Sequence, residues 1–523
     1  MAAFAFAMLA LGLALMVLTG WASYAVLLLM SVVIGAVGVA SGGIDAAILQ
    51  ALPSRLVGLL EHDLLQAVAL YALVGALLRH THVAGQVFDG FAAALRRVGI
   101  PWRACPALAG FGVGMLAAPM NGSVGAGIGM LAHTVTPRWR EHGIQRPAAT
   151  ALTAVTATLG VLVPPSLVLL LLGDAMLRAH TEGLTLAGTQ GVRVINVQDL
   201  IQACTPVAAL LALAWAATAA WRARAAPALG PAPAAAHELP APQLCLAALL
   251  VPAVVGLLLT GVASGHLRAV EAAATAALAL LAHCLSSGQL PRSRLGQVLD
   301  DAMALTGALF ALLIAATTLS LVLRAAGCDQ AVSRALAHLS GHPLLATLAV
   351  LSGLLLVSFI LDAFEIVFLV VPIVMPPLLA QVPDAAWVAC LTLLVLQAGF
   401  LLPPWGYAVV LARAMSGTDG ASPKALAREL LPYLAVLTVV AATVFACPEI
   451  THWMRGAPDR VDANVPDDKA AEDLLRSMTP APEETAPEAS AEAPSQASPS
   501  QASPQQAPPR APPVVPPKQP APN

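Results

Sequence analysis

The sequence contains the pattern G-x-L-x-P-P twice, at residues 160–165 and 399–404, each time inside a long apolar run. A glycine followed by two prolines interrupts a helix, because a proline lacks a backbone N–H and its ring clashes with the preceding turn. In a lipid bilayer, the carbonyl groups freed by such a break need partners within the protein or in a water-filled cavity. Interrupted apolar segments at matching positions of two halves are typical of the binding site of a secondary transporter. The alternative is a pair of unrelated proline kinks.

Composition places the chain among membrane proteins. Its 523 residues are 58% hydrophobic and 11% charged, with a mean hydropathy of +0.79, which predicts an all-α polytopic membrane protein. The seven cysteines are scattered without a C-x-x-C pair, so neither a disulfide framework nor a transition-metal site is expected. The sequence has no Walker A motif and no basic cluster of the nucleic-acid-binding kind, so we expect neither ATP hydrolysis nor a nucleic-acid partner.

Apolar runs of about 17–25 residues between charged breaks predict the spans. Two halves of the chain, residues 1–221 and 243–455, give the same order: three spans, an interfacial helix, a re-entrant hairpin, an interrupted helix and a closing span. In the first half we expect spans at 4–19, 22–41, 63–79 and 201–221, an interfacial helix at 84–99, the hairpin at 104–135 and the interrupted helix at 147–175. In the second we expect spans at 243–261, 269–285, 300–323 and 431–447, an interfacial helix at 330–340, the hairpin at 344–380 and the interrupted helix at 386–412.

Arginines predict opposite orientations for the two halves. Six of them flank the first hairpin, and neither Lys nor Arg occurs between Arg334 and Arg413, around the second. By the positive-inside rule the first hairpin opens to the cytoplasm and the second to the external side, so the halves form an inverted-topology repeat. Both termini then lie outside, which in a bacterial inner membrane is the periplasmic side. Residues 222–242 form an Ala/Pro-rich cytoplasmic linker, and residues 456–523 a disordered tail rich in Pro, Ala, Ser and Glu.

Oxygen-bearing residues at the hairpin tips and helix breaks are the candidate binding groups. Amide and hydroxyl oxygens, together with carbonyls freed at a break, suit a small cation such as Na⁺, and the N-termini of half-helices favour an anionic substrate group. An ordinary Asn-Gly turn, and threonine hydroxyls bonded within their own helix, are the alternatives. The candidates of the first half are Asn121, Gly122, Ser123, Thr158, Gly160, Pro164 and Pro165.

The second half adds two carboxylates. Asp362 and Glu365 lie near the middle of its predicted hairpin, and an ionisable residue at membrane depth is a functional candidate, although a hairpin tip that reaches water would also explain them. The other candidates there are Gln397, Gly399, Pro403 and Pro404 at the second break. Because carboxylates at an i, i+3 spacing share a helix face, a membrane enzyme with an acid/base pair is a second hypothesis. Neither a nucleophile motif nor a metal cluster accompanies the pair, so no catalytic residue is assigned.

Four stretches together carry a resemblance to a known family. They are Thr158–Ser166 around the first break, Val270–Ala274 after a glycine-containing loop, Leu361–Ile366 in the second hairpin, and Leu402–Gly406 at the second break. In this order they resemble the large membrane (permease) subunit of the tripartite ATP-independent periplasmic (TRAP) transporters over residues 1 to about 455. The Phe364-Glu365-Ile366 and Leu172-Gly173-Asp174 stretches are similar to the branch often labelled mannitol or chloroaromatic compound type.

The resemblance implies an elevator-type secondary transporter with an ion-transporter-superfamily-like fold, driven by a sodium gradient and without a tightly bound cofactor. Its implied partners are a small four-span membrane subunit, a periplasmic solute-binding protein and a small organic acid as substrate. It also implies sodium sites where hairpin tips meet the helix breaks. The hairpin reads Asn121-Gly122-Ser123-Val124 where the family usually has Ser-Gly-Ser-Ser. A sodium–dicarboxylate symporter that works alone is the nearest alternative.

Overall fold

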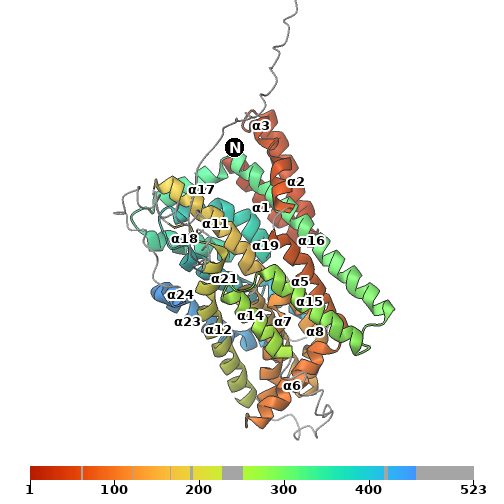
Figure 1. Ribbon diagram of the computed structural model, residues 1–523. Helices are drawn as coiled ribbons and strands as arrows, with labels where there is room; N and C mark the ends of the chain where they lie inside the picture. The colour runs from red at the N-terminus through yellow and green to blue at the C-terminus, as the bar shows by residue number, and fades with distance from the viewer. Residues whose placement is uncertain are drawn as a thin grey trace, which may run out of the picture. The chain divides into compact units, whose positions relative to one another are not determined.

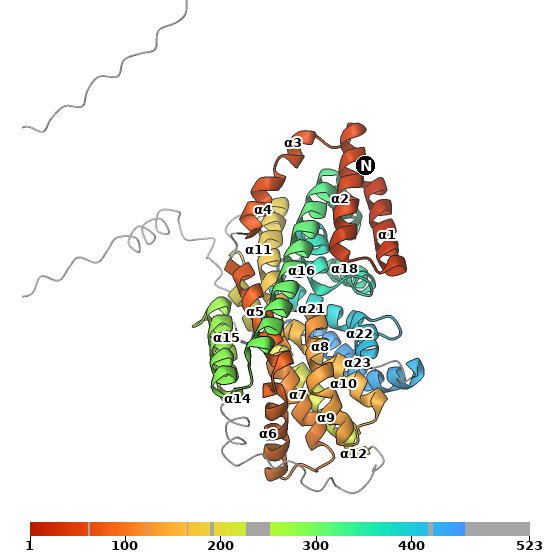
Figure 2. The same cartoon turned by 90° about the vertical axis from the view of Figure 1, so that its right-hand side faces the viewer.

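The computed structural model describes residues 1–60, 63–121, 123–164, 166–188, 193–225, 251–416 and 422–454. Within these ranges the regular structure is entirely helical (Figures 1 and 2). Seven of the described helices are long and apolar enough to cross a membrane, or eight if a bent pair counts as one span. The prediction of an all-α polytopic membrane protein is therefore confirmed. The tail predicted at 456–523, and residues 226–242 of the predicted linker, lie outside the described residues.

The first half contains the predicted elements in the predicted order. Two spans, α1 (Ala2–Thr19) and α2 (Ser23–Ala40), meet at Gly20, whose left-handed φ of 66° ends α1. The remaining helices are α3 (Ala46–Leu49), α4 (Leu52–Leu60), α5 (Asp63–His80), α6 (Val83–Arg97), α7 (Cys105–Ala117), the 3₁₀ turn η1 (Pro119–Asn121), α8 (Val124–Thr134), α9 (Thr136–Glu141), α10 (Arg146–Leu162), α11 (Leu167–Ala187) and α12 (Val197–Ala225). The chain bends by 71° between α5 and α6, which separates the third span from the predicted interfacial helix.

The second half repeats this order from α14 onwards. Its helices are α14 (Val251–Ala263), α15 (Ala269–Ser286), α16 (Arg292–Ala325), α17 (Cys328–Ala337), α18 (Pro343–Val357), α19 (Ala363–Glu365), the π-helical turn η3 (Ile366–Val370), α20 (Val371–Leu379), α21 (Ala385–Leu401), α22 (Tyr407–Met415), α23 (Pro423–Ala446) and α24 (Glu449–His452). Figure 1 places α6 and α17, the amphipathic helices of the two halves, at opposite ends of the bundle. Such a placement is what an inverted repeat requires.

The two halves interlock. The second half of the first interrupted helix, α11, packs along α20 of the second hairpin, and α22 of the second interrupted helix packs against α8 of the first hairpin. Likewise α10 packs on α23 and α21 packs on α12. One arm of each hairpin, α8 or α20, is thus held by an interrupted helix of the other half, whereas the other arm, α7 or α18, packs on the interrupted helix of its own half.

Buried tryptophans fasten the closing spans. The Trp215 indole N–H of α12 donates to the Tyr433 carbonyl of α23 at 3.0 Å, and the Trp387 N–H of α21 donates to the Val444 carbonyl, also in α23, at 2.8 Å. A buried indole combines a large apolar contact with one donor that needs a partner. An unpaired polar group is costly in a lipid environment, so these two hydrogen bonds favour the packing of α23 against both α12 and α21.

Several helices run beyond their predicted bounds: α11 ends at Ala187 and not at residue 175, and α23 begins at Pro423 and not at residue 431. Helix α16 has 34 residues and begins at Arg292, whereas the span was expected to start at residue 300. Helix α12 continues to Ala225, into the predicted linker. For α16 and α12, charged residues were taken to end a span, although a charged turn can continue a helix beyond the membrane. Asp301 of α16, for example, pairs with His80 of α5 at 2.7 Å and with Arg79 at 3.3 Å.

Single cysteines at exposed serines test the opposite orientation of the two halves. In a background lacking Cys245 and Cys447, Ser340 after α17 and Ser287 after α15 are replaced in turn by cysteine; both serines are exposed. An impermeant maleimide applied to whole cells should label Ser340→Cys but not Ser287→Cys, and permeabilised cells should give both signals. Labelling of Ser287→Cys alone in whole cells would reverse the assigned orientation.

Candidate functional site

The glycine of the first G-x-L-x-P-P pattern lies against the tip of the first hairpin. An ideal Cβ built on Gly160 would stand 2.7 Å from the carbonyl oxygen of Ala118 and 2.9 Å from its carbonyl carbon. Ala118 directly follows α7, the first arm of the hairpin. The helix α10 therefore approaches the hairpin backbone more closely than any residue with a side chain allows.

The same contact recurs in the second half. A Cβ on Gly399 would overlap the Ser358 hydroxyl oxygen and stand 2.9 Å from the Ser358 Cβ. Ser358 directly follows α18, the first arm of the second hairpin, and its hydroxyl donates to the Leu355 carbonyl at 2.7 Å. In each half the glycine before the two prolines is thus the point where the interrupted helix meets the hairpin tip.

Helix ends of like polarity converge at these two contacts. The C-terminal ends of α7 and α10 meet at Gly160, and those of α18 and α21 meet at Gly399. The last carbonyls of a helix lack intrahelical partners and carry partial negative charge. Two such ends side by side favour a small cation between them. The chain then re-enters helix at α11 and α22, whose N-terminal ends favour an anionic group.

A polar cross-link joins the two interrupted helices close to both breaks. The Gln397 side-chain N–H of α21 donates to the Thr158 carbonyl of α10 at 2.7 Å, while the Thr158 hydroxyl donates to the Val155 carbonyl of its own helix at 2.8 Å. Two buried side-chain oxygens of these helices, Oε1 of Gln397 and Oγ1 of Thr156, have no hydrogen-bond partner among the described residues. A buried acceptor without a partner costs about 1–3 kcal/mol, so such atoms mark places where a ligand would be stabilised.

The two carboxylates of the second hairpin differ in their surroundings. Glu365 is buried, and its carboxylate accepts hydrogen bonds from the Asp362 backbone N–H at 3.0 Å and from the Ser23 hydroxyl. Asp362 is the N-cap residue of α19, and its Oδ1 atom is buried with no hydrogen-bond partner among the described residues. Glu365 therefore stabilises the tip of the hairpin, whereas Asp362 keeps an oxygen available to a ligand.

The structure places the other candidates at the two tips and breaks. Ser123 caps α8, with its hydroxyl accepting from the Ala126 N–H at 3.1 Å, and Asn121 ends the turn η1. Pro164 is buried, Pro403 is half-buried and Pro404 is exposed, and the peptide bond between the last two is cis. Gly122 and Pro165 lie outside the described residues, so their predicted roles are not addressed by the structure.

Three residues at these contacts were not anticipated from the sequence. Ala118 and Ser358 form the surfaces against which the glycines pack, and small residues in an apolar run give no signal of such a role. Tyr407, at the start of α22, places its hydroxyl 2.8 Å from an ideal Cβ on Gly125 of α8, so the second break also touches the first hairpin. For Tyr407 the sequence did contain a signal, because it is an aromatic residue with a polar hydroxyl that follows the second G-x-L-x-P-P pattern closely.

An all-helical membrane protein with two re-entrant hairpins, each seated on an interrupted helix of an inverted repeat, has the architecture of a secondary transporter. The chain matches the family model described as "Tripartite ATP-independent periplasmic transporter, DctM component" over residues 2–450, and it belongs to this family. The resemblance to the large TRAP membrane subunit is therefore confirmed at the level of the family. Because this is a family of transporter permeases, the membrane-enzyme hypothesis has no support from it.

The chain is also similar to a TRAP permease of known substrate name and to a transporter of known structure. The chain is 24% identical over 410 residues to the sialic acid TRAP transporter permease protein SiaT of Haemophilus influenzae (strain 86-028NP), which is 76% of this chain and 61% of that protein. The matched region thus spans less than two thirds of that relative. The crystal structure of the Alcanivorax borkumensis YdaH transporter superposes with a TM-score of 0.54 at 15% identity, covering 83% of this chain and 98% of that one. This similarity between the chain and the YdaH transporter shows a shared fold.

Alanine substitutions test the two glycine contacts. Gly160→Ala meets backbone atoms of Ala118, so the hairpin must move, and we expect a destabilisation of about 1–3 kcal/mol, typical of overpacking. Gly399→Ala mainly meets the side chain of Ser358, so the double variant Gly399→Ala/Ser358→Gly should recover most of the loss. The readout is the temperature at which half of the detergent-solubilised protein is lost from the size-exclusion peak.

Gly353→Ala in α18 is the matched control, because a Cβ there has open space within 4 Å. This substitution should leave the temperature of half-loss unchanged or raise it slightly, since alanine is a better helix former than glycine. If Gly160→Ala and Gly399→Ala behave like this control, the two close glycine contacts do not exist in the folded protein.

Proposed function

We propose that this chain is the large permease subunit of a TRAP-type secondary transporter that imports a small carboxylated solute with a sodium gradient. The observation that carries the proposal is the pairing of two hairpin tips with two helix breaks through Gly160 and Gly399, in a chain of the DctM family.

Sodium as the coupling ion is supported by the chemistry of the available donors. The carbonyl ends of α7, α10, α18 and α21, the free Oδ1 of Asp362 and the oxygens of Gln397 and Thr156 are all hard oxygen donors. Oxygen ligands of this kind suit hard cations, whereas transition metals prefer nitrogen and sulfur. The described part of the chain contains no group of three or more His, Cys, Asp or Glu side chains arranged to hold a metal ion. The ligand role of Asn121, Gly122 and Ser123 stays a prediction of the family resemblance.

An organic acid as substrate is supported by the N-terminal ends of α11 and α22. Between Arg334 and Arg413 the sequence has neither Lys nor Arg, so in the second half a substrate carboxylate would be held by backbone N–H groups and bound sodium. A solute of the mannitol or chloroaromatic compound type remains the prediction from Phe364-Glu365-Ile366 and Leu172-Gly173-Asp174.

The elevator-type mechanism is supported by how the helices associate. The hairpins and interrupted helices of the two halves hold one another through α11 with α20 and α8 with α22, while α16 packs mainly along α2 and α5. The hairpins and interrupted helices would move together as one body. The helices α2, α5 and α16 would keep a fixed position in the bilayer while that body moves. An ion pair between Arg324 of α16 and Glu182 of α11 bridges these two groups of helices. The partners in this proposal are a small four-span membrane subunit and a periplasmic solute-binding protein, with the large subunit in the bacterial inner membrane and its tail on the periplasmic side.

Reconstituted uptake tests the proposal. Proteoliposomes with this chain, the small subunit and the binding protein should accumulate solute only with an inward sodium gradient, and Asp362→Asn should reduce uptake at least tenfold. The amide keeps the shape of the side chain and removes the charge that would face the ion. Asp45→Asn, at the exposed N-cap of α3 whose side chain accepts from the Ala47 N–H at 2.9 Å, is the control and should keep most of the activity, because Asn caps a helix as well as Asp does.

Two outcomes would overturn parts of the proposal. Uptake that is unchanged without any ion gradient contradicts sodium coupling. Full uptake without the binding protein and the small subunit would instead favour a symporter that works alone.

A further inference from the structure

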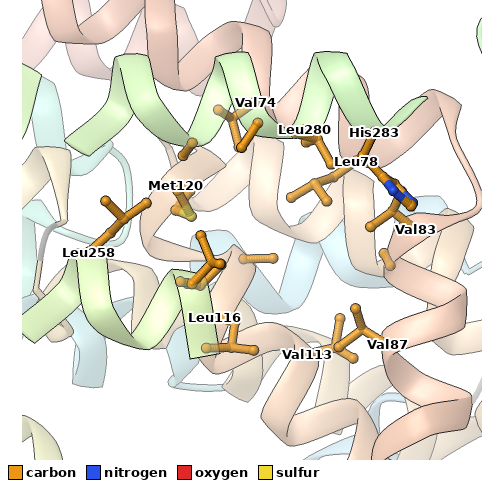
Figure 3. Close-up of a pocket in the computed structure, with 16 residues that line it drawn as sticks. Val74, Leu78, Val83, Val87, Val113, Leu116, Met120, Leu258, Leu280 and His283 are labelled. Atoms are coloured by element: carbon orange, nitrogen blue, oxygen red, sulfur yellow. The ribbon is translucent and has the colours of Figure 1, made fainter. Parts of the chain in front are cut away.

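A cavity of about 180 Å³ lies between the peripheral helices α14 and α15, the bent pair α5–α6 and the first hairpin. Its wall is apolar except for one imidazole, and it is lined by residues such as Val74, Leu78, Met120, Leu258, Leu280 and His283. Figure 3 shows these side chains directed into one space from several helices. None of them belongs to the hairpin–glycine contacts described above.

The size and lining of the cavity favour an apolar occupant. An apolar cavity of about 150 Å³ stays dry and accepts a small hydrocarbon, because water finds no polar partners there. At about 180 Å³, this cavity is slightly larger. An apolar occupant would restore the dispersion contacts that its lining residues lack on one side.

The cavity communicates with the membrane-facing side of α15. Ala279 lines the cavity and is itself exposed, and its neighbour Leu278 is 69% exposed on the same helix. A wall residue that is also exposed marks an opening. Since the span is surrounded by lipid, the hydrocarbon within reach of this opening is a lipid acyl chain.

A basic group lies near the imidazole end of the cavity. In Figure 3, His283 is at one end, beside Leu78 and Val83. The residue before Val83, His82, donates its backbone N–H to the Gln289 side chain at 3.1 Å, and Arg294 donates to the Gln289 carbonyl at 3.3 Å. Arg294 is therefore held near this end by a neutral partner. The neighbouring Arg79 is paired with Asp301.

We propose that this cavity binds an acyl chain of an anionic phospholipid from the cytoplasmic leaflet, with the phosphate held near Arg294. Anionic lipids are recognised by basic groups at the cytoplasmic ends of spanning helices. The predicted orientation puts the ends of α5 and α15 on that side. The bound chain would contact α14 and α15 on one wall and the first hairpin on the other, through Met120. None of the lining residues is a candidate ligand of the coupling ion or the solute, so lipid binding can be tested without a transport assay.

Photolabelling of the full-length protein tests the site. The probe is phosphatidylglycerol with a diazirine in one acyl chain, added to nanodiscs containing the protein, and labelled peptides are identified by mass spectrometry. We expect labelling of peptides from α5 and α15.

Two substitutions that fill the cavity should reduce this labelling. Ala279→Trp, which fills the opening, should lower the labelling at least fivefold, and Val255→Trp should do the same from the α14 wall. Ala274→Trp, at an exposed alanine of α15 that does not line the cavity, should leave it unchanged.

The headgroup is tested with a second variant and a second probe. Arg294→Gln should reduce labelling by the phosphatidylglycerol probe at least threefold and leave labelling by the matching phosphatidylcholine probe unchanged. If Ala279→Trp and Val255→Trp are folded by size-exclusion chromatography and still label like the wild type, the cavity does not hold the chain. Equal effects of Arg294→Gln on both probes would overturn the role of the anionic headgroup.

Discussion

The close approach of each interrupted helix to the tip of a hairpin is the contact on which the rest of the structure depends. At Gly160 the approach is to backbone atoms, and at Gly399 it is to the side chain of Ser358. Neither position has room for a Cβ, so the helix axis can come this near only because both residues are glycine. The prolines that follow then stop the helix at the point of contact. One short pattern, used twice, therefore sets both the position and the end of the helix.

This constraint has electrostatic consequences. Bringing two helix C-termini together in a low-dielectric setting concentrates partial negative charge, which a bound cation would offset. The hydrogen bond from the Gln397 side chain to the Thr158 carbonyl joins the interrupted helices of the two halves close to both breaks. Asp362, whose buried Oδ1 has no hydrogen-bond partner among the described residues, adds a carboxyl group to the second half. The first half has no equivalent carboxylate at its tip, and the sequence there offers amide and hydroxyl oxygens instead.

The sequence predicted the helices better than the contacts between them. Hydrophobic runs and charged breaks located the spans, hairpins and interrupted helices, whereas the orientation inferred from the arginines stays a prediction. The start of α16 at Arg292 was missed because a charged turn can continue a helix beyond the membrane. The packing partners of the glycines were also missed, because Ala118 and Ser358 become neighbours of the breaks only through tertiary packing. For the same reason the sequence could not separate Glu365, which stabilises its own hairpin, from Asp362.

Distance measurements between spin labels test the central claim, which is that the glycine contacts join hairpins and interrupted helices into one moving body. One pair joins exposed Met303 of α16 to exposed Val410 of α22, and the control pair joins exposed Leu348 of α18 to Val410. Both are placed in the Cys245- and Cys447-free protein, in nanodiscs with the proposed small subunit. With sodium and solute, the first pair should show two distance populations and the control pair a single unchanged one. A control distance that varies as much as the first, or a first distance that never varies, would contradict the account.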